Sequence, residues 1–378
     1  MAVKTKTKVY VAIGVVVIGL IIYGATKGAV KPTNPSDSFG SSQLPQSATQ
    51  NGLNSDGTPS VVGQDGDNKP LKVIRTWTRR DCSLAPWLVT DKLGYFQEEG
   101  VKLVFTGEIQ PPQQIPSLLS GDNDVATFHP NSAAVAINGG APLKGVSRCG
   151  VEPSADFDPE FRHMWWFVNP EKHPNVKSFA DLNNIEGQLI FSVITTTQCS
   201  DFLANQILDH NGVPRDKIEW VTMPDVQAIQ SLKQGQTDVG GVHPPFYKGM
   251  LDAGQLKIAD TLDAKLPPES AGLTYFFFTE EFIKNNPEAV RGFTRAMVRG
   301  LKFINDNPEQ ARLWTQEAIG IPVSANHYYT DNLRIEEEQI IPWLNDLENV
   351  GAIPPGKLKP SDLVTHEFED LDYVAPST

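Results

Sequence analysis

The sequence contains few cysteines, only three among 378 residues, which is too few for a disulfide scaffold. It also lacks the short motifs of several enzyme classes, because it has no GxSxG elbow, no HExxH zinc motif and no Walker-type phosphate loop. Dense metal-binding spacings such as CxxC and HxH are absent as well. We therefore expect no resident cofactor and no catalytic residues of these classes.

Positive charge is also scarce. There are 32 Lys and Arg residues against 45 Asp and Glu, so the formal net charge is −13. Five lysines precede the first acidic residue, Asp37, and residues 32–378 therefore carry −18, from 27 basic and 45 acidic side chains. A nucleic-acid-binding protein needs a basic face to neutralise phosphates. This balance excludes a nucleic-acid partner, while the length and the 40% hydrophobic content suit a large two-lobed globular chain.

The long apolar run of the chain lies near its start. Residues 9–23 are uninterrupted by polar groups, and with residues 24–26 they would form about 27 Å of helix, close to the thickness of a bilayer core. We expect residues 1–30 to be an uncleaved single-pass membrane anchor that leaves the rest of the chain outside the cytoplasm. The alternative is a cleaved signal peptide, which would make the protein secreted or periplasmic. Residues 31–70 are polar and predict a flexible linker.

From residue 71 onward, short β-type runs alternate with helical stretches. This alternation predicts an α/β fold with mostly parallel sheets covered by helices. One series extends to residue 147 and a second covers residues 188–242, with strongly apolar runs at residues 163–168 and 273–278. Residues 84–99 are expected to form one helix. Further helices are expected at residues 293–304, 311–319 and 339–347.

One motif occurs twice in this pattern. The pattern SLxxGxxDVxxxHP begins at Ser117 and again at Ser231, with seven shared positions at one offset of 114 residues. Gly, Asp and Val suit any helix–turn–strand unit, but the shared His-Pro pair does not follow from that. We therefore expect two lobes of similar design, with His129 and His243 at equivalent strand ends.

Several segments resemble a known family. Residues 93–101 (LGYFQEEGV) resemble the GYFxxEGL segment of solute-binding proteins for nitrate, sulfonate and taurine importers. Residues 118–126 (LLSGDNDVA), 138–143 (NGGAPL), 178–182 with Gly187, and 232–239 (LKQGQTDV) follow in the family's order and spacing. Each motif is weak alone, but their ordered set is fairly specific and covers roughly residues 71–353.

The resemblance implies a two-lobed, periplasmic-binding-protein-like (type II) fold with a hinge of two crossover strands, residues 163–168 and 273–278. Residues 71–165 plus 274–378 would form lobe 1 with the C-terminal helices, and residues 166–273 would form lobe 2. A monomer of this kind captures a small, mostly anionic ligand such as a sulfonate, taurine or nitrate, and delivers it to an ABC permease and its ATPase. Thiamine-pyrimidine synthases share the architecture, so an enzyme related to them remains an alternative.

In open α/β sheets, ligands bind beyond the C-terminal ends of the strands, and the family's ligand-binding residues come from the same loops. Arg79 and Arg80 follow the first strand and either offer guanidinium groups to an anion or are surface charges. The three threonines before Ser200 form a polar cradle or only a helix cap. The expected ligand-binding residues are Arg79, Arg80, Cys82, His129, Asn131, Thr195, Thr196, Thr197 and His243.

His129 and His243 come from different lobes, so lobe closure would bring them together. Cys82 and Cys199 lie at equivalent strand ends, and these four side chains would suit zinc or another transition metal. Binding of a transition metal or metal complex is therefore an alternative function. Other possibilities stay open: the histidines could bond an anion or cap a strand, and a disulfide from Cys82 to Cys149 would leave Cys199 single.

Overall fold

The computed structural model describes residues 70–373. The expected membrane anchor, residues 1–30, lies outside the described residues, and so does the linker apart from its last residue. Among residues 70–373, no helix combines the length and the apolar character that a bilayer crossing requires.

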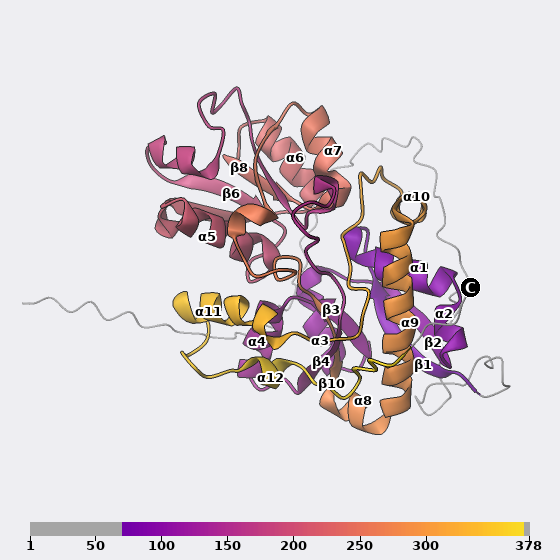
Figure 1. Cartoon of the computed structure of the whole chain (residues 1–378). Coiled ribbons are helices and arrows are strands. Elements are labelled where there is room, and N and C mark those ends of the chain that lie inside the picture. The colour runs from indigo at the N-terminus through magenta and orange to yellow at the C-terminus, as the bar shows by residue number, and fades with distance from the viewer. Residues whose placement is uncertain (1–69, 374–378) are drawn as a thin grey trace, which may run out of the picture. The chain divides into compact units, whose positions relative to one another are not determined.

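Lobe 1, as we use the term, is built on two sheets (Figure 1). Strand β1 (Lys72–Thr78) pairs in parallel with β2 (Val101–Glu108). Strand β10 (Tyr275–Thr279) lies between β3 (Val125–Phe128) and β4 (Leu143–Arg148), antiparallel to both. The helices of this lobe are α1 (Ala85–Lys92), α2 (Tyr95–Glu98), α3 (Gln114–Leu119), α4 (Pro130–Asn138), α8 (Glu280–Asn285), α9 (Pro287–Asp306), α10 (Pro308–Ile319), α11 (Ile341–Asn349) and α12 (Pro360–Leu363).

Lobe 2 is built on one five-stranded sheet in the order β7-β6-β8-β5-β9. Its strands are β5 (Trp165–Val168), β6 (Leu189–Val193), β7 (Ile218–Thr222), β8 (Val239–Val242) and β9 (Leu256–Asp260). Helices α5 (Cys199–His210), α6 (Asp225–Lys233) and α7 (Tyr247–Asp252) gather about this sheet in Figure 1. Strands β6, β7 and β8 pair in parallel, as βα alternation predicts.

The two apolar runs expected to be crossovers contain β5 and β10. All four residues of β5 are buried, as are the first four of β10, because both faces of each strand are covered. Both strands pair antiparallel with their neighbours, which differs from the mostly parallel sheets expected. The physical reason is the crossing itself: a strand that arrives from the other lobe enters the sheet from the end where its parallel strands finish.

The single helix expected at residues 84–99 is wrong. The chain instead forms α1 and the one-turn α2, separated at Leu93 and Gly94. Gly94 has a φ of 78°, a left-handed conformation that ends a right-handed helix and that glycine adopts without strain. The break turns the chain so that Trp87 and Phe96 both enter the core.

The repeated motif has a structural role that the aspartates reveal. The carboxylate of Asp124 accepts a hydrogen bond of 2.8 Å from the backbone N–H of Arg75 on β1. In lobe 2, the carboxylate of Asp238 accepts one of 2.8 Å from the backbone N–H of Ile190 on β6. Each aspartate therefore ties the strand that follows it to the first strand of its βα series.

We predict that Asp238→Ala lowers the free energy of unfolding by about 2–3 kcal/mol at pH 7, because it removes charge-assisted bonds to Ile190, His173 and Lys172. Burial favours a raised pKa for Asp238, but these partners outweigh it and hold the pKa below its ordinary value. The contribution is therefore present above the unfolded-state pKa, about 4, and is lost as the pH falls through the lower folded-state pKa.

Urea unfolding of both proteins at pH 7 and pH 3 measures this, and the difference should narrow at pH 3. Asp252→Ala is the control, since Asp252 is exposed and pairs only with Lys248 one turn away, so a change within about 0.5 kcal/mol is expected. An equal loss at both pH values would contradict an ionic role for Asp238.

Candidate ligand-binding site

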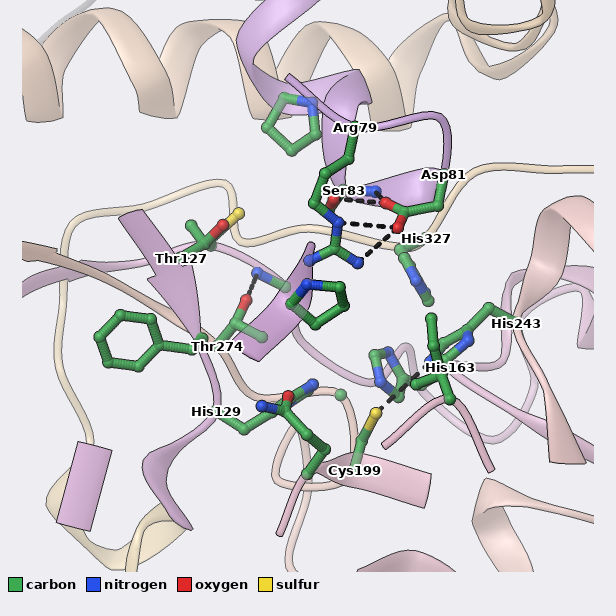
Figure 2. Close-up of a pocket in the computed structure, with 18 of the residues that line it drawn as sticks. Arg79, Asp81, Ser83, Thr127, His129, His163, Cys199, His243, Thr274 and His327 are labelled. Atoms are coloured by element: carbon green, nitrogen blue, oxygen red, sulfur yellow. Dashed lines mark hydrogen bonds and ion pairs between the residues drawn. The ribbon is translucent and has the colours of Figure 1, made fainter. Parts of the chain in front are cut away.

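A small cavity lies where the C-terminal ends of strands from both lobes meet, and Figure 2 draws the side chains around it. Its volume is about 100 Å³, and residues that follow β1, β3, β6 and β8 contribute to its lining. A larger hollow of about 510 Å³ adjoins it and shares Arg79, Asp81, Thr195 and Asp225 with it. The strand-end loops of both lobes therefore surround one space.

His129 is the lobe 1 histidine of the repeated motif. Its extended backbone and the following Pro130 make it the N-cap of α4, which positions the ring at the cavity. Nδ1 lies 2.7 Å from the backbone oxygen of Leu273, and the ring stacks on Trp343 with centroids 5.1 Å apart. Because a carbonyl can only accept, Nδ1 is the donor and Nε2 of the neutral ring carries a lone pair.

Cys199, His243 and Asp225 form a hydrogen-bonded row in lobe 2. Sγ of Cys199 lies 3.4 Å from Nε2 of His243, and Nδ1 of His243 lies 2.7 Å from the Asp225 carboxylate (Figure 2). Burial opposes ionisation of the Cys199 thiol, but His129 and His243 outweigh it and lower its pKa to about 6. Burial likewise opposes the His243 charge, yet Asp225 and then Cys199 raise its pKa well above the ordinary value. The pair is therefore a thiolate beside an imidazolium at neutral pH.

Two further histidines join this site that were not predicted from the sequence. His163 lies just before β5, and its ring stacks on His327 with centroids 4.4 Å apart, while His129 and His243 lie edge-on at 5.2 and 5.5 Å. Burial, and then the neighbouring histidines, hold the pKa of His163 well below its ordinary value, so its ring is neutral. A histidine at the start of a crossover strand was the available signal for His163, whereas His327 lies outside any periodic pattern.

Three of these side chains bring potential metal ligands together. One ligand atom each from His129, His163 and Cys199 lie within 4.8 Å of one another, and all three residues are buried. His243, which the sequence placed in a metal set, contacts Cys199 but is not part of this group of three.

The two arginines expected at the site are each beside a carboxylate. Arg79 lines the cavity, but its guanidinium bonds Asp81, with Nε 2.9 Å from the carboxylate. The side chain of Arg80 is 66% exposed, lies 3.5 Å from Glu108 and lines only the outer hollow. The structure thus brings one guanidinium to the cavity, and that one is largely neutralised.

The other polar residues expected at the site divide in a similar way. Thr195 lines the cavity, whereas Thr196 and Thr197 are not among its lining residues. The carbonyl of Thr197 accepts a 2.8 Å hydrogen bond from Ser132 of lobe 1. Asn131 donates one of 2.8 Å to the carbonyl of Gln198. The turn before α5 and the start of α4 therefore join the two lobes beside the cavity.

The cysteines do not form the disulfide that was left open. Cys149 is a buried free thiol, and burial raises its pKa. Cys82 opens the short helical turn Cys82–Leu84, and its side chain lies outside the described part of the structure. Cys199 is also a free, buried thiol, and it is the one that meets the histidines.

A family model described as NMT1/THI5 like matches residues 82–311. No curated protein was found to match the sequence. The nitrate-binding protein NrtA from Synechocystis PCC 6803 superposes with a TM-score of 0.65 at 12% identity, covering 79% of this chain and 87% of NrtA. For the aliphatic sulphonate binding protein SsuA from Escherichia coli the values are 0.60, 16%, 78% and 92%.

A third similar structure is the desulfurization enzyme DSZB, with a TM-score of 0.55, 10% identity, and coverage of 79% of this chain and 97% of DSZB. At these identities the likeness establishes the fold alone. The α/β periplasmic-binding-protein fold expected from the sequence is confirmed.

Proposed function

The chain belongs to the NMT1/THI5-like family, and from this premise we propose that it is a solute-binding protein that captures a small anion between its two lobes. The observation that carries the proposal is the cavity: histidine and cysteine side chains from both lobes line one buried space of about 100 Å³. A space built jointly by two lobes suits a ligand that binds by drawing the lobes together.

Closure has direct support in the contacts between the lobes. Beside the cavity, Gln198 donates a 2.8 Å hydrogen bond to the hydroxyl of Ser132. Farther out, Arg215 of lobe 2 pairs with Asp346 of α11 at 2.8 Å. We propose that residues 71–165 plus 274–378 and residues 166–273 move as two bodies about the crossover strands. A ligand must bind the closed form about 10⁴-fold better than the open form to shift a 1:99 population to 99:1.

An anion is the ligand class that the charged groups favour. The His243 imidazolium and the Arg79 guanidinium both line the cavity. They act locally against the field of an acidic chain, whose formal charge is −13. Nitrate, taurine and other sulfonates are therefore the first ligands to test.

The family resemblance extends the proposal to partners and location. We propose that the monomer delivers its ligand to an ABC permease and its ATPase on the outer face of the cytoplasmic membrane. Residues 1–30 would hold the chain at that membrane, and residues 31–70 would give the binding domain reach.

We predict that His243→Ala weakens anion binding at least 10-fold, since it removes the cavity's imidazolium and leaves the Asp225 carboxylate unpaired. Isothermal titration calorimetry of the full chain with nitrate, taurine, an alkanesulfonate and bicarbonate measures this. Thr196→Ala is the control, because Thr196 is exposed and does not line the cavity. Equal affinity in wild type, His129→Ala and His243→Ala would rule out this cavity as the binding site.

An enzymatic role is the second candidate, favoured by the Cys199–His243–Asp225 row. A thiolate beside a histidine that a carboxylate orients is the arrangement of a nucleophile with its base. The same titrations separate the two functions: a binding protein returns its ligand unchanged, whereas an enzyme releases a product that mass spectrometry detects.

A further inference from the structure

The cavity contains a set of side chains better suited to a metal ion than to an anion alone. Two imidazoles and one thiolate, from His129, His163 and Cys199, bring their ligand atoms within 4.8 Å of one another. Ligand atoms around a tetrahedral zinc ion, at bond lengths of about 2.0–2.3 Å, lie about 3.5 Å apart. Small ring rotations therefore separate this arrangement from a coordination sphere.

The orientation of His129 is that of a metal ligand. Its Nδ1–H donates to the carbonyl of Leu273 at 2.7 Å, which holds the ring in place. Metal-binding histidines are commonly fixed in this way by a backbone carbonyl on the nitrogen that does not bind the metal. The free lone pair is then on Nε2, at the other end of the ring.

His163 supplies an independent observation. It is only 6% exposed, yet its Nε2 has no hydrogen-bond partner among residues 70–373. A buried polar atom without a partner carries a free-energy penalty of about 1–3 kcal/mol, so native structures usually satisfy such atoms with water, an ion or a ligand. A metal ion bound at this nitrogen would remove the penalty.

Cys199 is held by a second shell of its own. Asp225 fixes His243 at 2.7 Å, and His243 lies 3.4 Å from the Cys199 sulfur. This carboxylate–histidine pair orients the thiolate and tunes its basicity, much as outer-shell groups do around metal centres. Both kinds of outer-shell support, a carbonyl and a carboxylate–histidine pair, therefore converge on the same three ligands.

We propose that His129, His163 and Cys199 bind one transition-metal ion, with zinc as the reference ion, and that its fourth coordination position faces the cavity and takes the anionic solute. This deepens the proposed function and rests on it only for the solute. The N₂S donor set selects zinc, copper, cobalt or nickel over magnesium and calcium, which prefer oxygen ligands. It also explains how an acidic chain captures an anion, since the metal ion supplies the positive charge.

The test uses the full chain, freed of metal with a chelator and titrated with Co²⁺ and Zn²⁺ salts. We expect one Co²⁺ per chain, with a thiolate-to-cobalt charge-transfer band that Zn²⁺ abolishes by displacement. The band should vanish in Cys199→Ser and persist in Cys149→Ser, since Cys149 is a buried thiol outside the group of three. Zinc affinity should fall at least 100-fold in His163→Ala and stay unchanged in His366→Ala, because His366 lies apart between two glutamates.

His163→Gln repeats the test with a side chain that retains bulk and polarity, and thermal melting checks that each variant is folded. Anion titrations with metal-free and zinc-loaded protein separate the two proposals. Tighter anion binding in the zinc-loaded form supports the metal site. An anion that binds the metal-free protein equally well overturns the metal site but keeps the proposed function. Stoichiometric zinc that depends on the three ligands, with no anion bound, supports the metal site and overturns the proposed anion capture. Zinc binding that survives in Cys199→Ser and His163→Gln overturns the site.

Discussion

Arg162→Met should lower the free energy of unfolding by about 3–5 kcal/mol, the range expected when one partner of a buried ionic network is removed. The Arg162 side chain is 1% exposed, and its guanidinium donates to four backbone carbonyls at 2.9–3.2 Å. These carbonyls belong to Pro153, Ser154, Ala155 and Phe157. Methionine fills similar space but leaves all four without donors, together with the nearby Glu152 carboxylate.

The same substitution should also disturb the cavity. His163 is the next residue, and its backbone N–H is held by Glu152 at 3.2 Å. Chemical unfolding of the full chain measures the stability, and ligand or zinc titration measures the cavity. Arg162→Lys should recover part of the loss, because lysine keeps the charge but cannot reach four carbonyls at once.

Arg334→Met is the control, since the Arg334 side chain is 61% exposed and lies 3.8 Å from Glu336. Its effect should stay within about 0.5 kcal/mol. If Arg162→Met were as mild as Arg334→Met, the loop before β5 would have to be held by something other than this guanidinium.

Arg162 illustrates what sequence patterns cannot predict. The stretch before β5 has no hydrophobic period, and its order comes from one side chain that collects carbonyls five to nine residues upstream. The strands and helices follow from short-range patterns, which is why the βα series and both crossover runs were predictable. Only Gly94, where one residue's conformation overrides a helical pattern, broke an expected helix in two.

The candidate site divides along the same line. His129, Cys199 and His243 were predictable because strand ends of parallel units meet at one edge, and the repeated motif matched the two histidines. His163 and His327 reach the cavity from a crossover and from the C-terminal segment, whose positions depend on tertiary packing. The expected role of Asn131 met another competing interaction, because its amide bonds the Gln198 carbonyl across the two lobes.

Trp343→Ala should lower the free energy of unfolding by about 3–5 kcal/mol and weaken ligand binding at least 10-fold. Trp343 is fully buried on α11, where its indole stacks on Phe202 of lobe 2 at a centroid distance of 4.0 Å and on His129 of lobe 1 at 5.1 Å. Its Nε1–H donates to the carbonyl of Ser270 at 3.1 Å. One side chain thus supports a cavity histidine and joins the lobes.

Chemical unfolding and titration of the full chain measure both effects, and small-angle scattering should give a larger radius of gyration for the variant if the lobes separate. Trp314→Ala is the matched control, because Trp314 on α10 is partly buried and stacks on Phe303 at 5.7 Å, away from the cavity. It should reduce stability without changing affinity.

A double-mutant cycle with Phe202→Ala separates the two contributions of the indole. If Trp343 acts across the lobes, the two substitutions should be coupled by about 1 kcal/mol in the ligand-bound protein, and the coupling should shrink in the ligand-free protein as the lobes open. Coupling of equal size in both states would mean that Trp343 and Phe202 stay in contact throughout. The motion that admits the ligand would then have to occur elsewhere than between α11 and α5.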